Sequence, residues 1–276
     1  MNQANEWVDR LNACPWNEIH FEWHEQLEST QDRAQELLDS TIQRGAVVVA
    51  NAQSKGRGRS GREWISKENS GLFMSLTWRM NGLTQWLPVL PLIVASACVE
   101  AMRAIPGVSI PAHVKWPNDL YVQQRKIGGI LIDSRTNAAE HRTDLVIGLG
   151  ITLHAGADSF PREWRDRATA WSIEQAHVPS AARLGSACYT AIRMALERFE
   201  QLATGLAEPY GLNNNQKVDA WKTAIKEWIE TYMIWNEIEL PYRIGEQLIQ
   251  GKALKLNEHY HLQILTEDQQ MIWLRN

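Results

Sequence analysis

The sequence predicts an α+β fold, in which a large domain of strands and helices is followed by a small all-β unit. Up to residue 232, short apolar runs rich in β-branched residues alternate with segments whose apolar residues recur at helical spacing. After residue 232 the pattern changes to short alternating segments of the kind that form a small β-barrel or sandwich. We therefore expect one domain over residues 1–232 and a second over residues 233–276.

The composition excludes several classes of protein. The 276 residues are 44% hydrophobic and 22% charged, which is ordinary for a soluble globular chain. The net charge of −4 argues against a broad basic face that would coat nucleic acid. The three cysteines lie far apart, which fits a reducing, cytoplasmic compartment and argues against a disulfide framework or a zinc cluster. The N-terminus has no signal-peptide pattern, and the most apolar stretch, 87–99, is too short to span a bilayer.

The elements of the N-terminal half follow from local patterns. Residues 1–28 form a lead-in with a strand at 19–23, and a helix begins next, where Ser29 or Thr30 can cap it. A run of β-branched residues at 46–50 predicts a buried strand. Further along, the pattern predicts a strand at 72–78, a helix at 87–105, and strands at 114–116, 120–122, 129–133 and 144–150.

The C-terminal half is predicted to hold three more helices and then only strands. Two helices are expected near 161–176 and 181–203, and the second has apolar residues at helical spacing throughout. A polar patch at 211–215 precedes a last helix at 216–232. The strands of the small unit are expected at 237–242, 247–256, 261–266 and 271–274.

A loop rich in glycine and arginine follows the strand at 46–50. Its glycines allow close backbone approach to a ligand, its arginines are permanently charged donors suited to phosphate oxygens, and Trp64 at its exit can stack on a flat ring. Because like charges repel, we expect the empty loop to be disordered and an anionic ligand to order it. A solvated turn or an RNA-binding segment is the alternative, although the short, unrepeated loop directly after a strand favours a ligand site. The residues are Gly56, Arg57, Gly58, Arg59, Gly61 and Arg62.

A second motif places an acid and a lysine across a short polar turn. It reads Lys-Trp-Pro-Asn-Asp over 115–119 and continues as Lys-Ile-Gly-Gly-Ile-Leu over 126–131. Asp119 suits Mg²⁺ beside phosphates, and Lys126 offers a point charge to a phosphoryl oxygen. The alternative is a hairpin with surface ion pairs of little energetic value. Taken together, the two motifs predict a site that holds a nucleotide phosphate while a carboxylate attacks it.

These motifs, in this order, resemble the biotin protein ligase family over residues 25–155. Ser29 and Thr30 match the family's Ser-Thr pair before its first helix, and Gln53 with the glycine–arginine loop matches its adenylate-binding loop. The resemblance implies a mixed sheet flanked by helices and a small C-terminal SH3-like barrel. It also implies a two-step reaction, in which biotin and ATP form biotinyl-5′-AMP, which then acylates a specific lysine of an acceptor protein.

The resemblance also implies roles for individual residues, a metal ion that enters with ATP, and an acceptor protein. Catalysis would depend on Lys126 and Arg59, Mg²⁺ would enter with ATP at Asp119, and no tightly bound prosthetic group is expected. The acceptor would be the biotin carboxyl carrier protein of acetyl-CoA carboxylase, and pairing through exposed sheet edges leaves a homodimer open. Biotin would be bound by Ser29, Thr30, Gln53, Arg57, Lys126 and Gly129. ATP and the adenylate would be bound by Gly56, Arg57, Arg59, Arg62, Trp64, Lys115, Asn118 and Asp119.

The chain departs from the family pattern at three places. Thr152 and Gln31 stand where the family usually has asparagine, and the segment after Gly251 lacks a second glycine.

The Ser-Thr pair begins at residue 29, so we expect no preceding DNA-binding domain and no DNA partner. We expect no membrane partner either. Two alternatives stay open: a lipoate or octanoate ligase on the same scaffold, or a catalytically weak module that binds biotin or a nucleotide.

Overall fold

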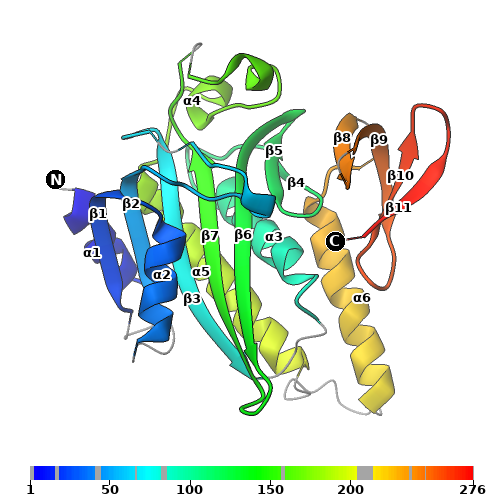
Figure 1. Cartoon of the computed structure of the whole chain (residues 1–276), viewed down its shortest axis with the longest axis horizontal. Helices are drawn as coiled ribbons and strands as arrows, with labels where there is room; N and C mark the ends of the chain where they lie inside the picture. Colours follow the sequence, from blue (N-terminus) through cyan, green and yellow to red (C-terminus); the bar gives the residue numbers. More distant parts are fainter. Residues whose placement is uncertain are drawn as a thin grey trace.

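The structure is a computed structural model in which a seven-stranded mixed sheet carries helices on both faces (Figure 1). It describes residues 3–15, 19–40, 45–65, 67–81, 86–156, 159–203, 214–235, 238–245 and 247–275. Across the sheet the order is β1 (Phe21–Leu27), β2 (Val47–Gln53), β3 (Gly71–Asn81), β7 (Arg142–Thr152), β6 (Arg125–Asn137), β5 (Asp119–Val122) and β4 (Ala112–Lys115). Only the pair of β1 and β2 is parallel within this sheet; the other neighbours are antiparallel, which confirms the mixed sheet.

The helices confirm most of the predicted ones. The helices expected at 87–105, 181–203 and 216–232 are present, and part of the polar patch at 211–215 lies outside the described residues. The lead-in contains a helix that was not predicted, because it is short and buries only two apolar residues, Trp7 and Leu11. The helices are α1 (Gln3–Asn12), α2 (Thr30–Asp39), α3 (Leu90–Ala104), α4 (Trp171–Glu174), α5 (Ala181–Ala203) and α6 (Asn214–Tyr232), with short 3-10 turns η1 (Arg59–Gly61) and η3 (Arg162–Trp164).

Strand β2 shows how the sheet is covered on both faces. Successive side chains of a strand point to opposite faces. Val48 belongs to a cluster with Ala34 and Leu38 of α2, whereas Val47 and Val49 belong to the larger core that α3 and α5 also enter. In Figure 1, α2 lies in front of the sheet and α3 and α5 lie behind it. This double burial explains the uninterrupted apolar run that predicted the strand.

The helix predicted at 161–176 is wrong. The segment instead holds η3 and α4, joined by a stretch that bonds to the start of β6. Lys126 donates its N–H to the carbonyl of Arg167 at 2.7 Å, and its own carbonyl accepts from the N–H of Thr169 at 2.8 Å. Backbone groups that pair with a strand cannot also pair within a helix, so the helical pattern is interrupted here.

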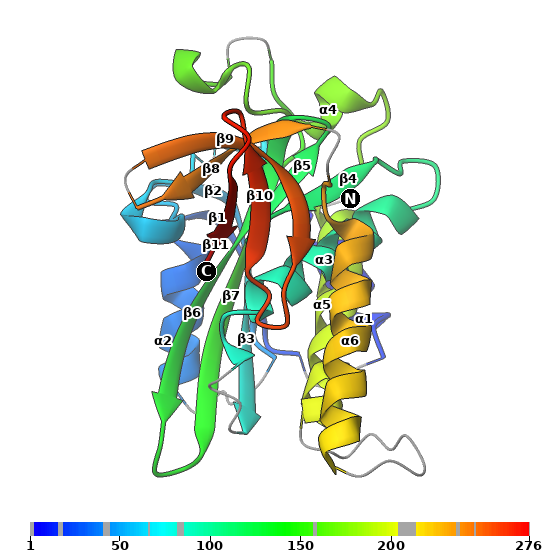
Figure 2. The same cartoon turned by 90° about the vertical axis from the view of Figure 1, so that its right-hand side faces the viewer.

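The C-terminal sheet consists of β8 (Glu239–Ile244), β9 (Gln247–Leu256), β10 (Leu262–Thr266) and β11 (Met271–Leu274), in the order β11-β10-β9-β8. The four predicted strands are therefore confirmed, and the antiparallel sheet is consistent with an SH3-like domain. Figure 2 shows it beside the β4–β5 hairpin at the upper end of α6. Its buried residues belong to the same core cluster as the main sheet, and the domain boundary at 232/233 stays a prediction. No helix in the described residues is both long and apolar enough to cross a bilayer.

Candidate active site

A cavity of about 380 Å³ lies between the loop at 54–65 and the middle of the large sheet. The start of α2 borders it on one side, and residues 160–168 border it on another. Gly56 and Lys115 lie outside this lining, whereas the other residues predicted to bind ligand share it. Those in the lining are Ser29, Thr30, Gln53, Arg57, Arg59, Arg62, Trp64, Asn118, Asp119, Lys126 and Gly129.

One end of the cavity is a network of uncharged hydrogen-bonding groups. Ser29 caps α2, so the helix begins at the cavity wall. Thr30 donates to the side-chain oxygen of Gln53 from its backbone N–H at 2.8 Å and from its hydroxyl at 3.1 Å. Its hydroxyl also lies 2.9 Å from that of Ser75, which donates to Gln31 at 3.1 Å. Because these side chains hold one another, the polar groups are preorganised for a neutral ligand.

Gln31 is buried and fixed more firmly than the sequence suggests. Its amide nitrogen donates to the carbonyl of Val146 at 3.0 Å and to the carboxylate of Asp133 at 3.2 Å. A Cβ on Gly148 would lie 2.5 Å from the Gln31 side-chain oxygen, so a glycine is needed for this close approach. From the sequence, Gln31 stands out only as a departure from the family pattern, and Ser75 was not predicted, although a serine inside an apolar strand is a usable signal.

The glycine–arginine loop is tied to the body of the protein along its length. Arg57 pairs with Asp32 at 2.6 Å and with Asp133 at 3.3 Å. Arg59 donates to the side-chain oxygen of Asn118 at 3.2 Å, and burial lowers the pKa of its guanidinium. These partners offset the repulsion within the loop on which the predicted disorder depended, and that disorder stays a prediction.

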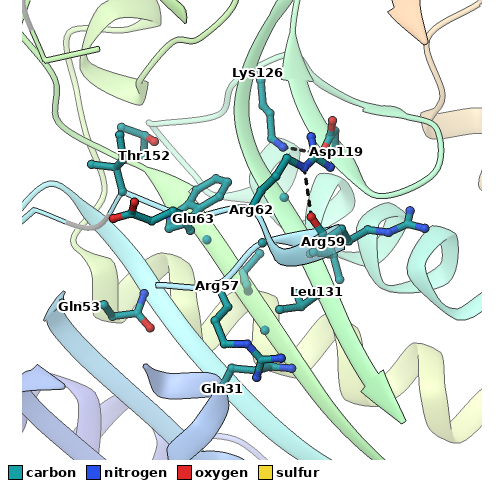
Figure 3. Close-up of a pocket in the computed structure, with 18 of the residues that line it drawn as sticks. Gln31, Gln53, Arg57, Arg59, Arg62, Glu63, Asp119, Lys126, Leu131 and Thr152 are labelled. Carbon is teal, nitrogen blue, oxygen red and sulfur yellow. Dashed lines mark hydrogen bonds and ion pairs between the residues drawn. The ribbon is translucent and has the colours of Figure 1, made fainter. Parts of the chain in front are cut away.

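The opposite end of the cavity holds the predicted acid and lysine. Asp119 and Lys126 lie on neighbouring strands, and the lysine Nζ contacts the carboxylate at 2.6 Å (Figure 3). Burial raises the pKa of Asp119, but the charges of Lys126 and Lys115 more than offset it, so this pKa lies below its ordinary value. Arg59 and Lys126 line the same cavity, as the sequence predicted.

Trp64 closes the cavity beside this ion pair. Its ring lies 5.5 Å from the Nζ of Lys126. A Cβ on Gly150 would lie 2.6 Å from the indole, so the ring packs directly on the backbone of β7. Gly148 and Gly150 alternate along one strand and therefore face the same side, a signal that the sequence analysis did not use. The lining also includes Thr152, Phe160, Pro161 and Trp164, of which the last three were not predicted.

Lys115 has a different environment from the other predicted site residues. Its side chain is buried, and its Nζ lies 5.3 Å from the ring centroid of Tyr121 and 5.0 Å from that of Tyr242. Burial lowers the pKa of its ammonium, and the negative charge of Asp119 works in the opposite direction. Its predicted contact with the adenylate is untested and stays a prediction.

The residues around Asp119 do not form a metal site by themselves. Within the described part of the chain, no three histidine, cysteine or acidic side chains group closely enough to hold a metal ion. One oxygen of Asp119 is engaged by Lys126, and the surrounding cations disfavour a bare divalent ion. A magnesium ion would therefore depend on phosphate oxygens for most of its ligands.

The comparisons with known proteins agree with this geometry. Residues 23–151 match the Biotin/lipoate A/B protein ligase family. The fold is similar to that of a biotin protein ligase from Aquifex aeolicus solved in complex with biotin and ATP, with a TM-score of 0.68 and 28% identity over 93% of this chain and 96% of that one. A Helicobacter pylori synthetase solved with biotinylated ATP, at 17% identity and a TM-score of 0.54, supports the fold alone.

Curated relatives include the bifunctional ligase/repressor BirA of Bacillus spizizenii, 36% identical over 166 residues, which are 60% of this chain and 50% of that protein. The human biotin–protein ligase is 39% identical over 103 residues, which are 36% of this chain and 14% of that protein. The chain spans about half the length of the Bacillus relatives it matches. The matched segment holds the capped helix, the loop and the Asp119–Lys126 pair. The chain is therefore similar to the biotin/lipoate protein ligases over the segment that carries its candidate site.

Proposed function

We propose that this chain is an ATP-dependent biotin protein ligase. The observation that carries the proposal is a single cavity with the uncharged hydrogen-bonding side chains of Thr30 and Gln53 at one end and the Asp119–Lys126 ion pair at the other. Biotin has the same division, since its ureido ring is neutral and its carboxylate is the reacting group. Binding in one orientation would bring that carboxylate to Lys126 and Arg59.

In the first step a carboxylate oxygen of biotin attacks the α-phosphorus of ATP, and the bond to pyrophosphate breaks. Negative charge that develops on the phosphoryl oxygens would be stabilised by the prepositioned cations Lys126, Arg59 and Arg62. Trp64 would pack against the ligand and help exclude water, which would otherwise hydrolyse the mixed anhydride. Magnesium would enter as part of the ATP substrate, and Asp119 could supply a carboxylate oxygen to it.

In the second step the neutral ε-amine of an acceptor lysine attacks the acyl carbon, AMP leaves, and a proton is released. The acceptor would be a biotin carboxyl carrier domain of acetyl-CoA carboxylase. We place the reaction in the cytoplasm, because the cysteines Cys14, Cys98 and Cys188 are free thiols that suit a reducing compartment. The homodimer stays a prediction.

Pyrophosphate release on mixing the protein with biotin, ATP and Mg²⁺ tests the first step. Mass spectrometry should detect biotinyl-5′-AMP in the same mixture, and added carrier protein should gain one biotin on one lysine. A protein that binds biotin but releases no pyrophosphate would be a binding module, and the proposal would be wrong.

A lipoate or octanoate ligase is the nearest alternative on this scaffold. The polar end of the cavity argues for biotin, because the hydrogen-bonding groups of Thr30, Gln31 and Gln53 offer partners to a ureido ring, whereas an alkyl chain or dithiolane can form no hydrogen bond with them. A ligand that gains no hydrogen bond at this end should bind more weakly than one that does.

A further inference from the structure

The Lys-Trp-Pro-Asn-Asp motif at 115–119 contacts both the cavity and the C-terminal sheet. Its last two residues, Asn118 and Asp119, line the cavity, whereas its first two, Lys115 and Trp116, are buried against the C-terminal sheet. The turn is short, since Lys115 of β4 pairs directly with Asp119 of β5. A displacement at one side of the turn is therefore transmitted to the other side through a few covalent bonds.

Lys115 contacts the C-terminal sheet through its charge. Its Nζ lies 5.0 Å from the ring centroid of Tyr242 on β8, within the range of a cation–π interaction, and 5.3 Å from that of Tyr121 on β5. Burial raises the pKa of both tyrosines well above the ordinary value, so both rings stay neutral. The ammonium is thus held between the two sheets by aromatic faces.

Trp116 makes the second connection. Its indole N–H donates to the carbonyl of Tyr260, in the turn between β9 and β10, at 3.1 Å. A third connection is made by the backbone, since Ile234 donates its N–H to the carbonyl of Val114 at 3.0 Å. The three contacts fall on consecutive residues 114–116 and join the turn to the chain that enters the C-terminal sheet.

The cavity side of the turn is equally well fixed. Asn118 exchanges two hydrogen bonds with Ile130 of β6, donating from its side chain at 2.6 Å and accepting on its carbonyl at 2.9 Å. Its side-chain oxygen also accepts from Arg59, and Asp119 holds Lys126. The turn therefore lies between the C-terminal sheet and the two cations assigned to phosphoryl transfer.

We propose that Lys115 and Trp116 are positioning residues, through which Tyr242 and Tyr260 of the C-terminal sheet hold the Asp119–Lys126 pair and the Asn118–Arg59 contact in place. The expected loss of kcat rests on the proposed function, whereas the expected loosening of the turn does not. It gives the C-terminal sheet a part in adenylate formation without any contact with the substrate.

The test compares Tyr242→Leu, which removes the aromatic face, with Tyr242→Phe, which keeps it. Amide hydrogen exchange at Ile130, measured without ligands, should become about ten-fold faster in the leucine variant, because the cation–π contact with Lys115 is lost. The kcat for biotin-dependent pyrophosphate exchange should fall by about ten-fold while the KM for biotin stays the same. The phenylalanine variant should match the wild type in both measurements.

Leu274→Ala provides the control, because Leu274 is buried in β11, at the far edge of the C-terminal sheet from β8. It should lower the melting temperature but leave exchange at Ile130 and kcat unchanged. The proposal is overturned if Leu274→Ala reproduces the leucine variant, or if Tyr242→Leu changes neither quantity. A wild-type protein with no biotin-dependent exchange would contradict the proposed function instead, and amide exchange would still decide the inference.

Discussion

The ion pair between Asp119 and Lys126 brings opposite charges together in a partly buried site, where the charges of Lys115 and Arg62 also lower the pKa of Asp119. Substituting Lys126 with alanine removes the cation nearest to the predicted phosphoryl group. We expect adenylate formation to fall by about 100-fold or more, as when a preorganised donor is removed from a transition state. Biotin-dependent pyrophosphate exchange measures it, and Lys126→Arg, which keeps the charge, should be less impaired. Full activity of Lys126→Ala would refute the role assigned to this side chain.

Gly148 lies so close to Gln31 that a single methyl group on it would collide with the Gln31 side chain. Gly148→Ala should displace the Gln31 side chain and disturb the neutral end of the cavity. We expect the KM for biotin to rise by about ten-fold, the effect of about 1.4 kcal/mol of lost binding, with little change in the KM for ATP. Gly156→Ala is a matched control, since among the described residues its new Cβ would meet only the Ser159 hydroxyl, at an ordinary 3.7 Å. Equal KM values for biotin in the two variants would show that Gln31 does not form part of the biotin site.

At the scale of elements, the glycine–arginine loop is held to the β4–β5 turn by Arg59 and Asn118. Arg59→Ala should weaken retention of the adenylate more than its formation, because the guanidinium contributes to loop closure as well as to charge. The leaked intermediate should then biotinylate lysines of a bystander protein such as serum albumin. Streptavidin blotting measures this labelling, and labelling no greater than that of the wild type would contradict the role of Arg59 in retaining the adenylate.

Strand β1 and helix α2 are joined by Glu22 and Arg33, whose side chains lie 2.7 Å apart. The hydrogen bond from Arg33, with smaller contributions from His24 and His20, outweighs burial and lowers the pKa of Glu22 to about 2. A carboxyl with a depressed pKa stabilises the fold above its unfolded pKa of about 4.5, and this contribution is lost as the pH falls towards 2. Glu22→Gln should therefore reduce the free energy of unfolding by about 1–2 kcal/mol at pH 7 but much less at pH 2.5. Urea titration at both pH values checks this, and a difference that does not change with pH would contradict it.

At the scale of the whole molecule, ligands that bind only the folded chain should stabilise it. At a hundred times its Kd a ligand contributes about 2.7 kcal/mol, which for a chain of this size raises Tm by about 5 °C. Biotin with ATP should give such a rise, and lipoate with ATP should give less than about 1 °C. A rise with lipoate alone would reject biotin as the substrate.

Local patterns in the sequence predicted most of the architecture. The apolar run at 46–50, the spacing in 181–203 and the alternation after 232 identified β2, α5 and the C-terminal sheet correctly, because each depends on its own residues. Helix α1 was missed because its stability comes from Trp7 packing on Gly185 far along the chain. The 161–176 segment was misassigned because its backbone pairs with Lys126.

The same distinction holds for the cavity. Residues in contiguous motifs, such as Arg59 and Lys126, were predicted to converge and do line one cavity. Ser75 and Gly148 were not predicted, because only the pairing of β3 with β7 brings them there. Residues within a contiguous motif can be predicted from the sequence, whereas residues on the opposite wall of the cavity can be identified only once the pairing of distant strands is known.

The backbone clamp on Lys126 has a practical meaning for protein engineering. The match to the family model stops at residue 151, yet the backbone of Lys126 is hydrogen-bonded to Arg167 and Thr169. A minimal gene trimmed to residues 23–151 would encode every predicted site residue but leave the backbone N–H and carbonyl of Lys126 without these two partners. Any shortened version intended for tagging or biosensing should therefore extend at least through Thr169.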